Sequence, residues 1–530
     1  MNDTETALQI NELSVEYGQD ECNNSVLNHV SMTLQKGEIL TLVGESGSGK
    51  STLAKAIGGL LPPSAHIVSG TMELRSGFHI PLNSNPKVWN RIRGQKIGFV
   101  FQDAQLALNP LMKIYNHFQE AILFHHIGSK KDVRAISRRY LEMLNFNNAD
   151  QVLNAYPFEL SGGMCQRICI ALALCLEPPV LIADEPTSAL DMISQTEVLN
   201  LLRKIQSELD LSVLMITHDM TIARQISDRV IVLNNGEIVE EGGVQEIFSR
   251  PKDAYTKKLL SSRTAYFHAA DLGSVGDEVV LRIENLQKSY PTQKDVLGGI
   301  SFDLHNNEIF GILGESGCGK STLAKCLIGL EPINGGQVLL RGENIIAAKG
   351  SKKREKCRHL QMIFQDARAS LNPRRSAVQI VQEPLSYLNL REESERTELA
   401  KHYLNEVGIG GDAQLRRPPQ LSTGQCQRVA IARALIVQPD VLICDEAVSA
   451  LDATVQSQIL ELLLQLHDEF NFSVVMITHD IQILRFFCHR IAVMQNGDFC
   501  EVSEGGETLN KSKNQYTQFL LKNEHDLIEA

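Results

Sequence analysis

The chain has 530 residues, of which 43% are hydrophobic and 22% charged, and its formal net charge is −12. This length allows two or more domains of ordinary size. A net negative chain offers no overall basic surface for a phosphate backbone, so nucleic acid is not expected as a partner.

No apolar run reaches the roughly 18 residues that a membrane-spanning helix needs. The most apolar segment, residues 168–176, ends at Glu177-Pro178-Pro179, which predicts a buried helix. The first residues, MNDTETALQINEL, lack the basic region and apolar core of a signal peptide. We therefore expect the chain to stay in the cytoplasm and to reach a membrane only through other subunits.

The eleven cysteines are scattered and form no C-x-x-C pair, which is typical of reduced thiols in the cytosol. Cys165, Cys169 and Cys175 lie close together, but inside an apolar helical pattern where cysteine packs as a small hydrophobe. His125-His126 has no cysteine or carboxylate nearby at ligand spacing. We expect a structural role at both places.

The chain contains an internal repeat, in which the same series of motifs occurs twice. The matching segments are LQINELSVEY from Leu8 and LRIENLQKSY from Leu281, GESGSGKSTLAKAIGGL from Gly44 and GESGCGKSTLAKCLIGL from Gly314, VLIADEPTSALD from Val180 and VLICDEAVSALD from Val441, and SVLMITHD from Ser212 and SVVMITHD from Ser473. The constant order predicts a tandem duplication, with domains at 1–260 and 279–530 and a polar linker at 261–278. Buried-strand patterns alternate with helical ones in each half, which predicts α/β domains with a largely parallel central sheet.

A glycine-rich loop follows the first buried strand of each half. The expected ATP-binding residues are Gly44, Glu45, Ser46, Gly47, Ser48, Gly49, Lys50, Ser51 and Thr52, and Gly314, Glu315, Ser316, Gly317, Cys318, Gly319, Lys320, Ser321 and Thr322. Such a P-loop turns successive backbone N–H groups toward phosphate oxygens, and the following helix adds its positive N-terminal end. The lysines would neutralise the β- and γ-phosphates, and Ser51 and Ser321 would ligate Mg²⁺.

Adjacent carboxylates, Asp184-Glu185 and Asp445-Glu446, end a buried strand in each half. We expect each aspartate to hold Mg²⁺ and each glutamate to polarise the attacking water.

Three further pairs lie at matching positions. His218 and His479 are expected to contact the γ-phosphate and hold the glutamate, and Gln102 and Gln365 to touch Mg²⁺ or water. Tyr17 and Tyr290, upstream of the P-loops, offer aromatic faces for adenine.

Together with these motifs, Leu160-Ser-Gly-Gly-Met-Cys-Gln-Arg167 and Leu421-Ser-Thr-Gly-Gln-Cys-Gln-Arg428 resemble the signature segment of ABC transporter nucleotide-binding domains. The resemblance covers nearly the whole chain. It implies two P-loop cassettes, each with a central mostly parallel sheet, an antiparallel β subdomain and a helical subdomain. It also implies head-to-tail pairing, in which each ATP contacts one P-loop and the opposite signature. The signature residues are Ser161, Gly162, Gly163, Ser422, Thr423 and Gly424.

Three departures from the family pattern predict two active but unequal sites. Thr423 replaces a signature glycine, Met164 replaces the signature glutamine, and Ala447-Val448 stands where the first half has Pro186-Thr187.

The Asn-Pro pairs at Asn109-Pro110 and Asn372-Pro373, and the segments AYTKKLL from Ala254 and QYTQFLL from Gln515, resemble the peptide/nickel/opine importer group. That resemblance implies an ATP-hydrolysing importer subunit at the cytoplasmic face of the membrane, partnered by two integral-membrane permease subunits and a solute-binding protein. The implied cargo is nickel or a metallophore complex, with di- or oligopeptides as the next choice. The alternative is a soluble twin-cassette ATPase acting on ribosomes or DNA, against which the short linker argues.

Overall fold

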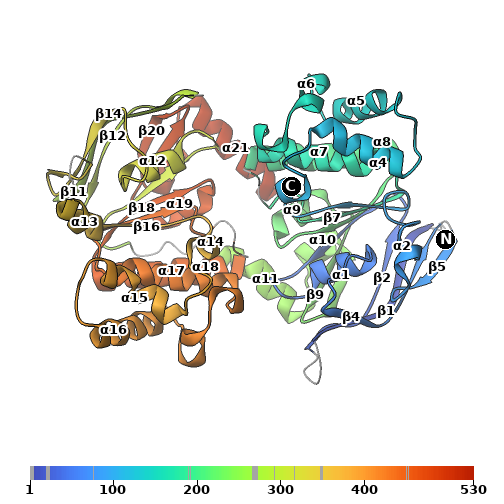
Figure 1. Cartoon of the computed structure of the whole chain (residues 1–530), viewed down its shortest axis with the longest axis horizontal. Coiled ribbons are helices and arrows are strands. Elements are labelled where there is room, and N and C mark those ends of the chain that lie inside the picture. The colour runs from blue at the N-terminus through green and yellow to red at the C-terminus, as the bar shows by residue number, and fades with distance from the viewer. Residues whose placement is uncertain are drawn as a thin grey trace. The chain divides into compact units, whose positions relative to one another are not determined.

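The computed structural model describes residues 5–18, 24–75, 77–188, 190, 192–265, 272–291, 293–315, 317–346, 350–448, 451 and 453–529. The chain separates into two compact units, one built mainly from residues up to Thr264 and one from Ala265 to His525 (Figure 1). Helix α11 (Ala254–Ala265) runs past the predicted domain end at 260, and strand β11 (Val279–Tyr290) begins where the second domain was predicted to start. The predicted boundaries themselves remain a proposal.

The first unit begins with an antiparallel sheet of order β2-β1-β4-β5. Its strands are β1 (Thr6–Tyr17), β2 (Asn24–Gln35), β4 (Ala65–Leu74) and β5 (Phe78–Pro81). In β1, the buried residues step by two from Leu8 to Ile10, then by three to Leu13. A shift in the pairing register lies at that step, because an extra residue is needed to keep the apolar side chains on the same face.

The main sheet of the first unit has the order β10-β9-β3-β8-β7-β6. Its parallel strands are β3 (Ile39–Val43), β6 (Ile97–Val100), β7 (Val180–Asp184), β8 (Ser212–Ile216) and β9 (Arg229–Asn234), and β10 (Glu237–Gly243) pairs antiparallel to β9. Every residue of β3, β7 and β8 is buried, as expected of parallel strands covered on both faces.

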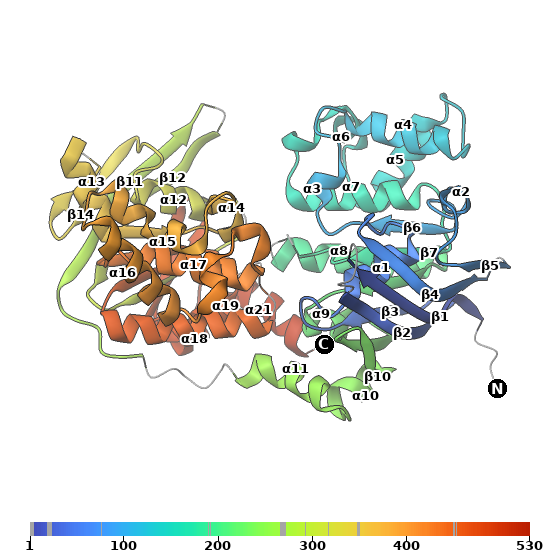
Figure 2. The same cartoon turned by 60° about the horizontal axis from the view of Figure 1, so that its bottom comes forward.

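Helices cover this sheet and also form a separate layer. The remaining helices of the unit are α1 (Lys50–Ile57), α2 (Pro86–Trp89), α3 (Ala104–Ala107), α4 (Ile114–Phe124), α5 (Val133–Met143), α6 (Ala149–Asn154), α7 (Gly162–Leu174), α8 (Met192–Leu209), α9 (Met220–Ile226) and α10 (Val244–Ser249). In Figure 2, α4, α5 and α6 lie on one side of α7, and β6 and β7 lie on the other. Helix α7 therefore connects the helical layer to the sheet.

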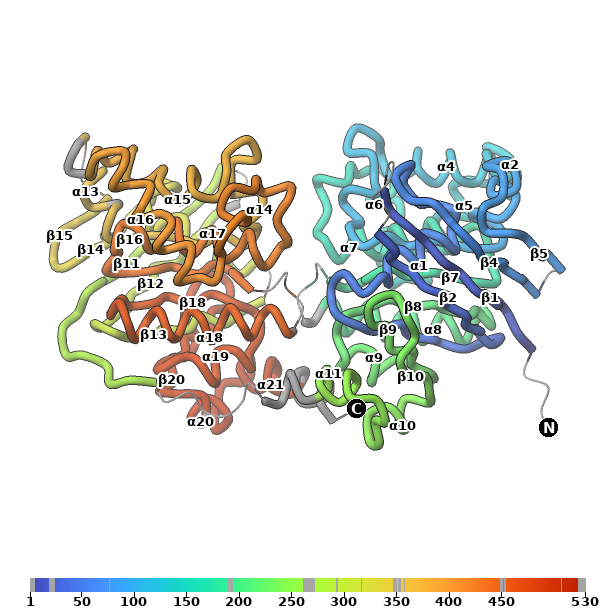
Figure 3. Tube along the Cα trace, turned by 90° about the horizontal axis from the view of Figure 1, so that it is seen from below, coloured from blue at the N-terminus to red at the C-terminus, as the bar shows by residue number. Residues whose placement is uncertain are grey.

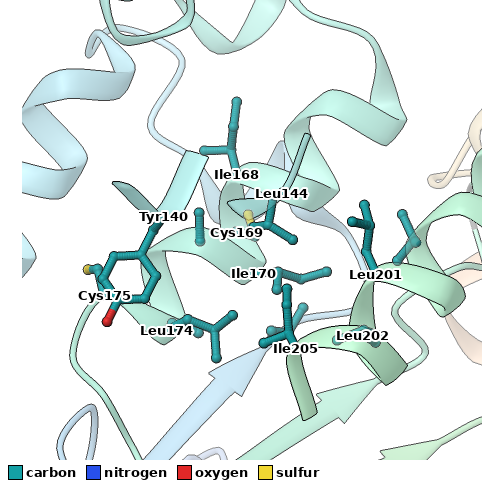
Figure 4. Close-up of a cluster of buried hydrophobic side chains, with 14 of the residues drawn as sticks. Tyr140, Leu144, Ile168, Cys169, Ile170, Leu174, Cys175, Leu201, Leu202 and Ile205 are labelled. Atoms are coloured by element: carbon teal, nitrogen blue, oxygen red, sulfur yellow. The ribbon is translucent and has the colours of Figure 1, made fainter. Parts of the chain in front are cut away.

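The core beneath α7 contains the cysteines noted in the sequence. Figure 4 shows Cys169 near Leu144 and Cys175 beside Tyr140, all within one buried apolar cluster. Burial raises the pKa of both thiols to about 12, so they stay protonated. Nine cysteines in the described part of the chain are free, and Cys165, Cys169 and Cys175 are buried, in agreement with a packing role.

The second unit repeats the first. Its antiparallel sheet has the order β12-β11-β14-β15 and its main sheet β16-β17-β18-β13-β19-β20, with only β20 antiparallel in the latter. The strands after β11 are β12 (Gln293–His305), β13 (Ile309–Leu313), β14 (Gly335–Leu340), β15 (Glu343–Asn344), β16 (Leu360–Ile363), β17 (Val441–Asp445), β18 (Ser473–Thr478), β19 (Arg490–Gln495) and β20 (Asp498–Glu504). The helices are α12 (Lys320–Leu327), α13 (Gly350–His359), α14 (Ala367–Ser370), α15 (Ala377–Tyr387), α16 (Glu393–Glu406), α17 (Thr423–Leu435), α18 (Ala453–Phe470), α19 (Ile481–Phe487), α20 (Gly505–Leu509) and α21 (Gln515–Glu529).

The described residues show neither a membrane-spanning helix nor a metal-binding cluster. They contain no helix that is both long and apolar enough to cross a membrane. Within the same residues, no group of three or more His, Cys, Asp or Glu side chains is arranged to hold a metal ion, and this includes the surroundings of His125 and His126.

Candidate functional site

Each glycine-rich loop joins the central strand of a main sheet to the helix that follows it. In the first unit, the loop runs from β3 into α1, whose N-cap Gly49 has a left-handed φ of 106°. A Cβ on Gly49 would lie 2.7 Å from the Leu27 side chain, and one on Gly44 would lie 2.2 Å from the Leu233 carbonyl oxygen. Only glycine fits at these two positions, because the loop curls tightly against the neighbouring strands.

The P-loop lysines are buried and point back into their own loops. Lys50 Nζ donates to the carbonyl oxygens of Gly44 at 2.8 Å and Glu45 at 2.7 Å. Lys320 makes the same two contacts to Gly314 and Glu315, both at 2.8 Å. Both ammonium groups are therefore held in the hollow of the loop, about where phosphate oxygens bind in such loops.

A serine and an aspartate meet behind each lysine. Ser51 Oγ donates to Asp184 Oδ1 at 3.1 Å, and Ser321 Oγ donates to Asp445 Oδ1 at the same distance. Burial raises the pKa of both aspartates, and the neighbouring Glu185 or Glu446 charge adds to the effect. The serine hydrogen bond and the nearby lysine charges act in the opposite direction but do not cancel the effect of burial.

The glutamate after each aspartate is the centre of a small hydrogen-bond network. Glu185 Oε2 accepts from Gln102 Nε2 at 2.7 Å, while Glu185 Oε1 lies 3.0 Å from His218 Nδ1. The backbone of Glu185 is left-handed, with φ of 47°, and its N–H donates to the Ile216 carbonyl of β8. A non-glycine residue held in this conformation stores strain, which is typical of functional sites.

The second unit has the same network with one looser contact. Glu446 Oε2 accepts from Gln365 Nε2 at 2.7 Å, but His479 Nδ1 lies 3.4 Å from Glu446 Oε1. Glu446 also has φ of 47°. The structure thus brings together the predicted Gln, Glu and His of each half.

Within each network the glutamate pKa is lowered and the histidine pKa is raised from its ordinary value. Burial by itself would raise the pKa of Glu185, but the hydrogen bond and charge of His218, with Lys50 and Gln102, hold it below its ordinary value. Burial by itself would lower the pKa of His218, but the hydrogen bond and charge of Glu185 outweigh it and raise the pKa. Glu446 and His479 shift in the same directions. Each glutamate is therefore ionised at neutral pH and able to accept a proton.

The predicted adenine-stacking tyrosines lie apart from this network. Tyr17 Oη is 3.5 Å from Thr52 Oγ1 at the start of α1. The Tyr290 ring lies beside Lys288, whose Nζ is 4.5 Å from the ring centre. Ser316, predicted as part of the second P-loop, lies outside the described residues.

The signature serines are the N-caps of α7 and α17. Ser161 Oγ accepts from the Met164 N–H at 3.3 Å, and Ser422 Oγ accepts from the Gln425 N–H at 3.2 Å. Gln425 also returns a contact, since its Oε1 accepts from the Ser422 N–H at 3.0 Å. Met164 has no such side-chain acceptor, so only α17 has a complete capping box.

Close packing leaves no room for a larger side chain at one of the signature glycines. A Cβ on Gly424 would lie 2.6 Å from Val455 Cγ1 of α18, while one on Gly163 would lie 3.3 Å from Ser194. Thr423, which replaces a signature glycine, is the first residue of α17 and is exposed.

The sequence interpretation missed one residue at the P-loop. Tyr255 of α11 places its hydroxyl 2.9 Å from the backbone N of Glu45, where it accepts the hydrogen bond. The signal was present in the repeated AYT and QYT segments at Ala254 and Gln515, which were used only as marks of a family resemblance.

Comparison with known proteins agrees with this geometry. The ABC transporter family model matches residues 27–188 and 297–449. The chain is 34% identical to the glutathione import ATP-binding protein GsiA of Escherichia coli K12, covering 98% of this chain and 89% of that protein. It is also 34% identical to the protein of the same name in Pectobacterium atrosepticum, with 97% and 89% coverage.

Among solved structures, a dimeric ATP-binding cassette in a post-hydrolysis state with ADP and Pi is 31% identical, with a TM-score of 0.40, covering 45% of this chain and 98% of that one. The cbiO1 protein of Clostridium perfringens, part of the transporter complex cbiONQ, is 27% identical with a TM-score of 0.40, covering 47% and 100%.

The predicted α/β fold with two tandem P-loop cassettes is therefore confirmed. With two family matches in one chain and a relative aligned over nearly its full length, this protein belongs to the ABC transporter family as an ATP-hydrolysing subunit with two nucleotide-binding cassettes.

Proposed function

We propose that this chain is the ATP-hydrolysing subunit of an importer and that both of its P-loops bind and hydrolyse ATP. The observation that carries the proposal is that each unit holds a full set of lysine, aspartate, glutamate, glutamine and histidine in matching contacts. Import is supported by the relatives, which are glutathione import ATP-binding proteins. The comparisons give no support to action on ribosomes or DNA.

Each ATP would lie between the P-loop of one cassette and the signature helix of the other. One site would join Lys50, Asp184, Glu185 and His218 to Ser422, and the other would join Lys320, Asp445, Glu446 and His479 to Ser161. The N-terminal ends of α7 and α17 support this pairing, since a helix N-terminus with a serine cap presents N–H groups and a partial positive charge to a phosphate.

The donor set beside each P-loop fits Mg²⁺. A serine hydroxyl and a buried aspartate lie 3.1 Å apart, and hard oxygen donors of this kind suit Mg²⁺ together with substrate phosphates. Burial raises the pKa of Asp184 and Asp445, and a cation bound beside them would favour their charged forms. When bound, Mg²⁺ supplies positive charge to the transferring phosphoryl group.

The chain's own residues supply the rest of the chemistry. Lys50 moves its contacts from the loop carbonyls to the phosphates and compensates their charge. Glu185, kept ionised by His218, orients a water and accepts its proton. Gln102 fixes the second carboxylate oxygen, so the glutamate presents one defined face. Lys320, Glu446, His479 and Gln365 take the same roles in the second unit.

The two sites are proposed to be active but unequal. The looser contact between His479 and Glu446 affects the site with the second P-loop. That same site would use the α7 signature, which lacks a capping box, while the other would use the α17 signature with Thr423. Each site therefore carries a different departure.

Two integral-membrane permease subunits and a solute-binding protein are the proposed partners, at the cytoplasmic face of the membrane. An apolar cavity of about 570 Å³ in the first unit supports a docking role, since Phe99, Phe124 and Leu172 line it between sheet and helical layer. Leu106 of α3 and Leu111, between α3 and α4, are each 85% exposed. A permease segment with an apolar face fits such a surface.

The cargo is proposed to be a small peptide such as glutathione, because the relatives are glutathione import ATP-binding proteins. Nickel or a metallophore complex, the first choice from the sequence, stays a prediction. A strain that lacks this gene should lose uptake of labelled glutathione or dipeptide. A plasmid copy of the gene should restore that uptake, and Ni²⁺ uptake should be the same with and without the plasmid. Restoration of Ni²⁺ uptake alone would contradict the peptide assignment.

Replacing Glu185 and Glu446 together with glutamine should abolish phosphate release while ATP still binds. The proton acceptor is lost, and general base catalysis contributes about 10²- to 10⁴-fold. Steady-state phosphate release and equilibrium nucleotide binding measure the two effects. Glu177→Gln is a matched control, because Glu177 shares the left-handed backbone, φ 52°, but contacts Tyr140 instead. Wild-type turnover in the double variant would refute the assigned role.

The charge of Glu185 should determine the pKa of His218. In the native protein that pKa lies above the ordinary value, and in Glu185→Gln it should fall below it, because burial remains while the carboxylate is gone. The ion pair's contribution to the free energy of unfolding is fully present below the ordinary histidine pKa. It is lost as the pH rises through the raised pKa of His218. NMR titration of labelled histidine measures this, and His479 in the other unit is an internal control that should not move. An unchanged His218 pKa would mean that the carboxylate does not set it.

The signature serines should act on opposite P-loops. Ser422→Ala should weaken photolabelling of the first P-loop by an ATP analogue at least about tenfold, because one phosphate donor is removed, while the second P-loop keeps its labelling. Ser161→Ala should give the reverse pattern. Mass spectrometry of the labelled fragments locates each lesion. Loss of labelling in the serine's own half would exclude the head-to-tail arrangement.

A further inference from the structure

One peptide group of the first P-loop is held from both ends. The carbonyl oxygen of Gly44 accepts from Lys50 Nζ at 2.8 Å, and the N–H of the same peptide unit, on Glu45, donates to Tyr255 Oη at 2.9 Å. The tyrosine hydroxyl and the lysine ammonium are therefore linked through a single peptide plane. Hydrogen bonds in such a chain polarise one another, so each contact strengthens the other.

Tyr255 is fixed in place by its own surroundings. Its backbone N–H donates to Asp253 Oδ1 at 2.7 Å, which starts helix α11. The Glu240 carboxylate of β10 accepts from the Lys252 N–H at 2.8 Å and the Asp253 N–H at 3.1 Å. The hydroxyl is thus placed by a strand and a helix outside the P-loop.

The tyrosine ring packs on a separate apolar cluster. The cluster contains Val43, the last residue of β3, together with Ile247 of α10 and Leu259 of α11. Figure 3 shows α10 and α11 on the side of the first unit where β9 and β10 lie. Because Val43 directly precedes Gly44, the same cluster supports the loop and the tyrosine.

The second unit has an equivalent residue, Tyr516, 261 positions later. Burial raises the pKa of Tyr516, the Glu315 charge adds to this, and a hydrogen bond with the Glu315 backbone opposes it. The tyrosine is anchored in the same way there, with Asn514 in the place of Asp253. Its N–H donates to Asn514 Oδ1 at 2.9 Å, and the next residue, Thr517, donates to Glu501 at 2.6 Å.

We propose that Tyr255 and Tyr516 are positioning residues that set the affinity of each P-loop for the β- and γ-phosphates of ATP. Each hydroxyl fixes the peptide plane against which its P-loop lysine is aligned. The effect is local to one cassette and reaches the phosphates through the lysine. The inference rests on ATP binding by the P-loops, as in the proposed function, and not on the cargo.

The test uses the full chain with Lys320→Ala, so that nucleotide binding reports the first P-loop. In this parent, Tyr255→Phe should weaken binding of a fluorescent ATP or ADP analogue about three- to tenfold, the loss expected for one hydrogen bond. Binding of the matching AMP analogue should not change, because AMP has no β- or γ-phosphate for the lysine.

Two controls separate positioning from general stability. In the same parent, Tyr516→Phe removes an equivalent hydroxyl from the other unit, and Tyr140→Phe removes a hydroxyl that contacts Glu177 in the first unit. Both should leave binding unchanged. Equal weakening for ATP and AMP, equal weakening by Tyr516→Phe, or full affinity in Tyr255→Phe would each overturn the proposal. Failure of the Lys320→Ala parent to bind ATP at all would instead contradict the proposed function.

Discussion

The site depends on one constraint, the parallel register of three buried strands. Strand β8 lies between β3 and β7, and Ile216 of β8 is the register partner of both Leu42 and Asp184. Because parallel strands end at the same edge of a sheet, the P-loop, the Asp-Glu pair and the histidine all leave the sheet at one edge. Residues more than 130 positions apart in the chain, such as Ser51 and Asp184, thereby come within hydrogen-bond distance. The second unit has the same arrangement, because Leu313 of β13 and Asp445 of β17 both have register partners at the end of β18.

At this edge of the sheet, the pKa values of the neighbouring ionisable side chains are shifted in different directions. Lys50 is only 5% exposed and relies on loop carbonyls, while the aspartate behind it has a raised pKa because of burial. The glutamate one residue later has a lowered pKa, because the left-handed turn at Glu185 brings its carboxylate to His218 and Gln102. The pKa values of adjacent carboxylates are thus shifted in opposite directions, which agrees with the proposal that the aspartate holds a cation and the glutamate orients a water.

The sequence was sufficient for the fold and for most of the site, because the motifs recur in order and the strand patterns are strong. Lys50, Asp184, Glu185, His218 and Gln102 could all be named before their contacts were known. The contacts between them depend on tertiary structure, so the Gln102–Glu185 bond and the left-handed glutamate could not be predicted. Tyr255 was missed for the same reason, since its hydroxyl reaches the P-loop from a helix 210 residues further along the chain. The bulge in β1 also escaped prediction, because it interrupts the alternation on which strand patterns depend.

Comparing the two units shows which distances the chemistry requires. The Ser–Asp distance is 3.1 Å and the Gln–Glu distance 2.7 Å in both. Supporting contacts have changed: Arg203 pairs with Asp228 in the first unit, whereas His489 occupies the position of Asp228 in the second and contacts the Gly273 carbonyl. Of the two signature helices, α17 has a capping box and α7 has none, and the histidine contact is 3.0 Å in one unit and 3.4 Å in the other. The two units therefore differ at the signature helices and the histidine contacts, while the lysine, serine and carboxylate contacts of the P-loops are nearly the same. Any inequality between the two ATP sites should then arise from the signature and histidine contacts and not from phosphate binding by the loops.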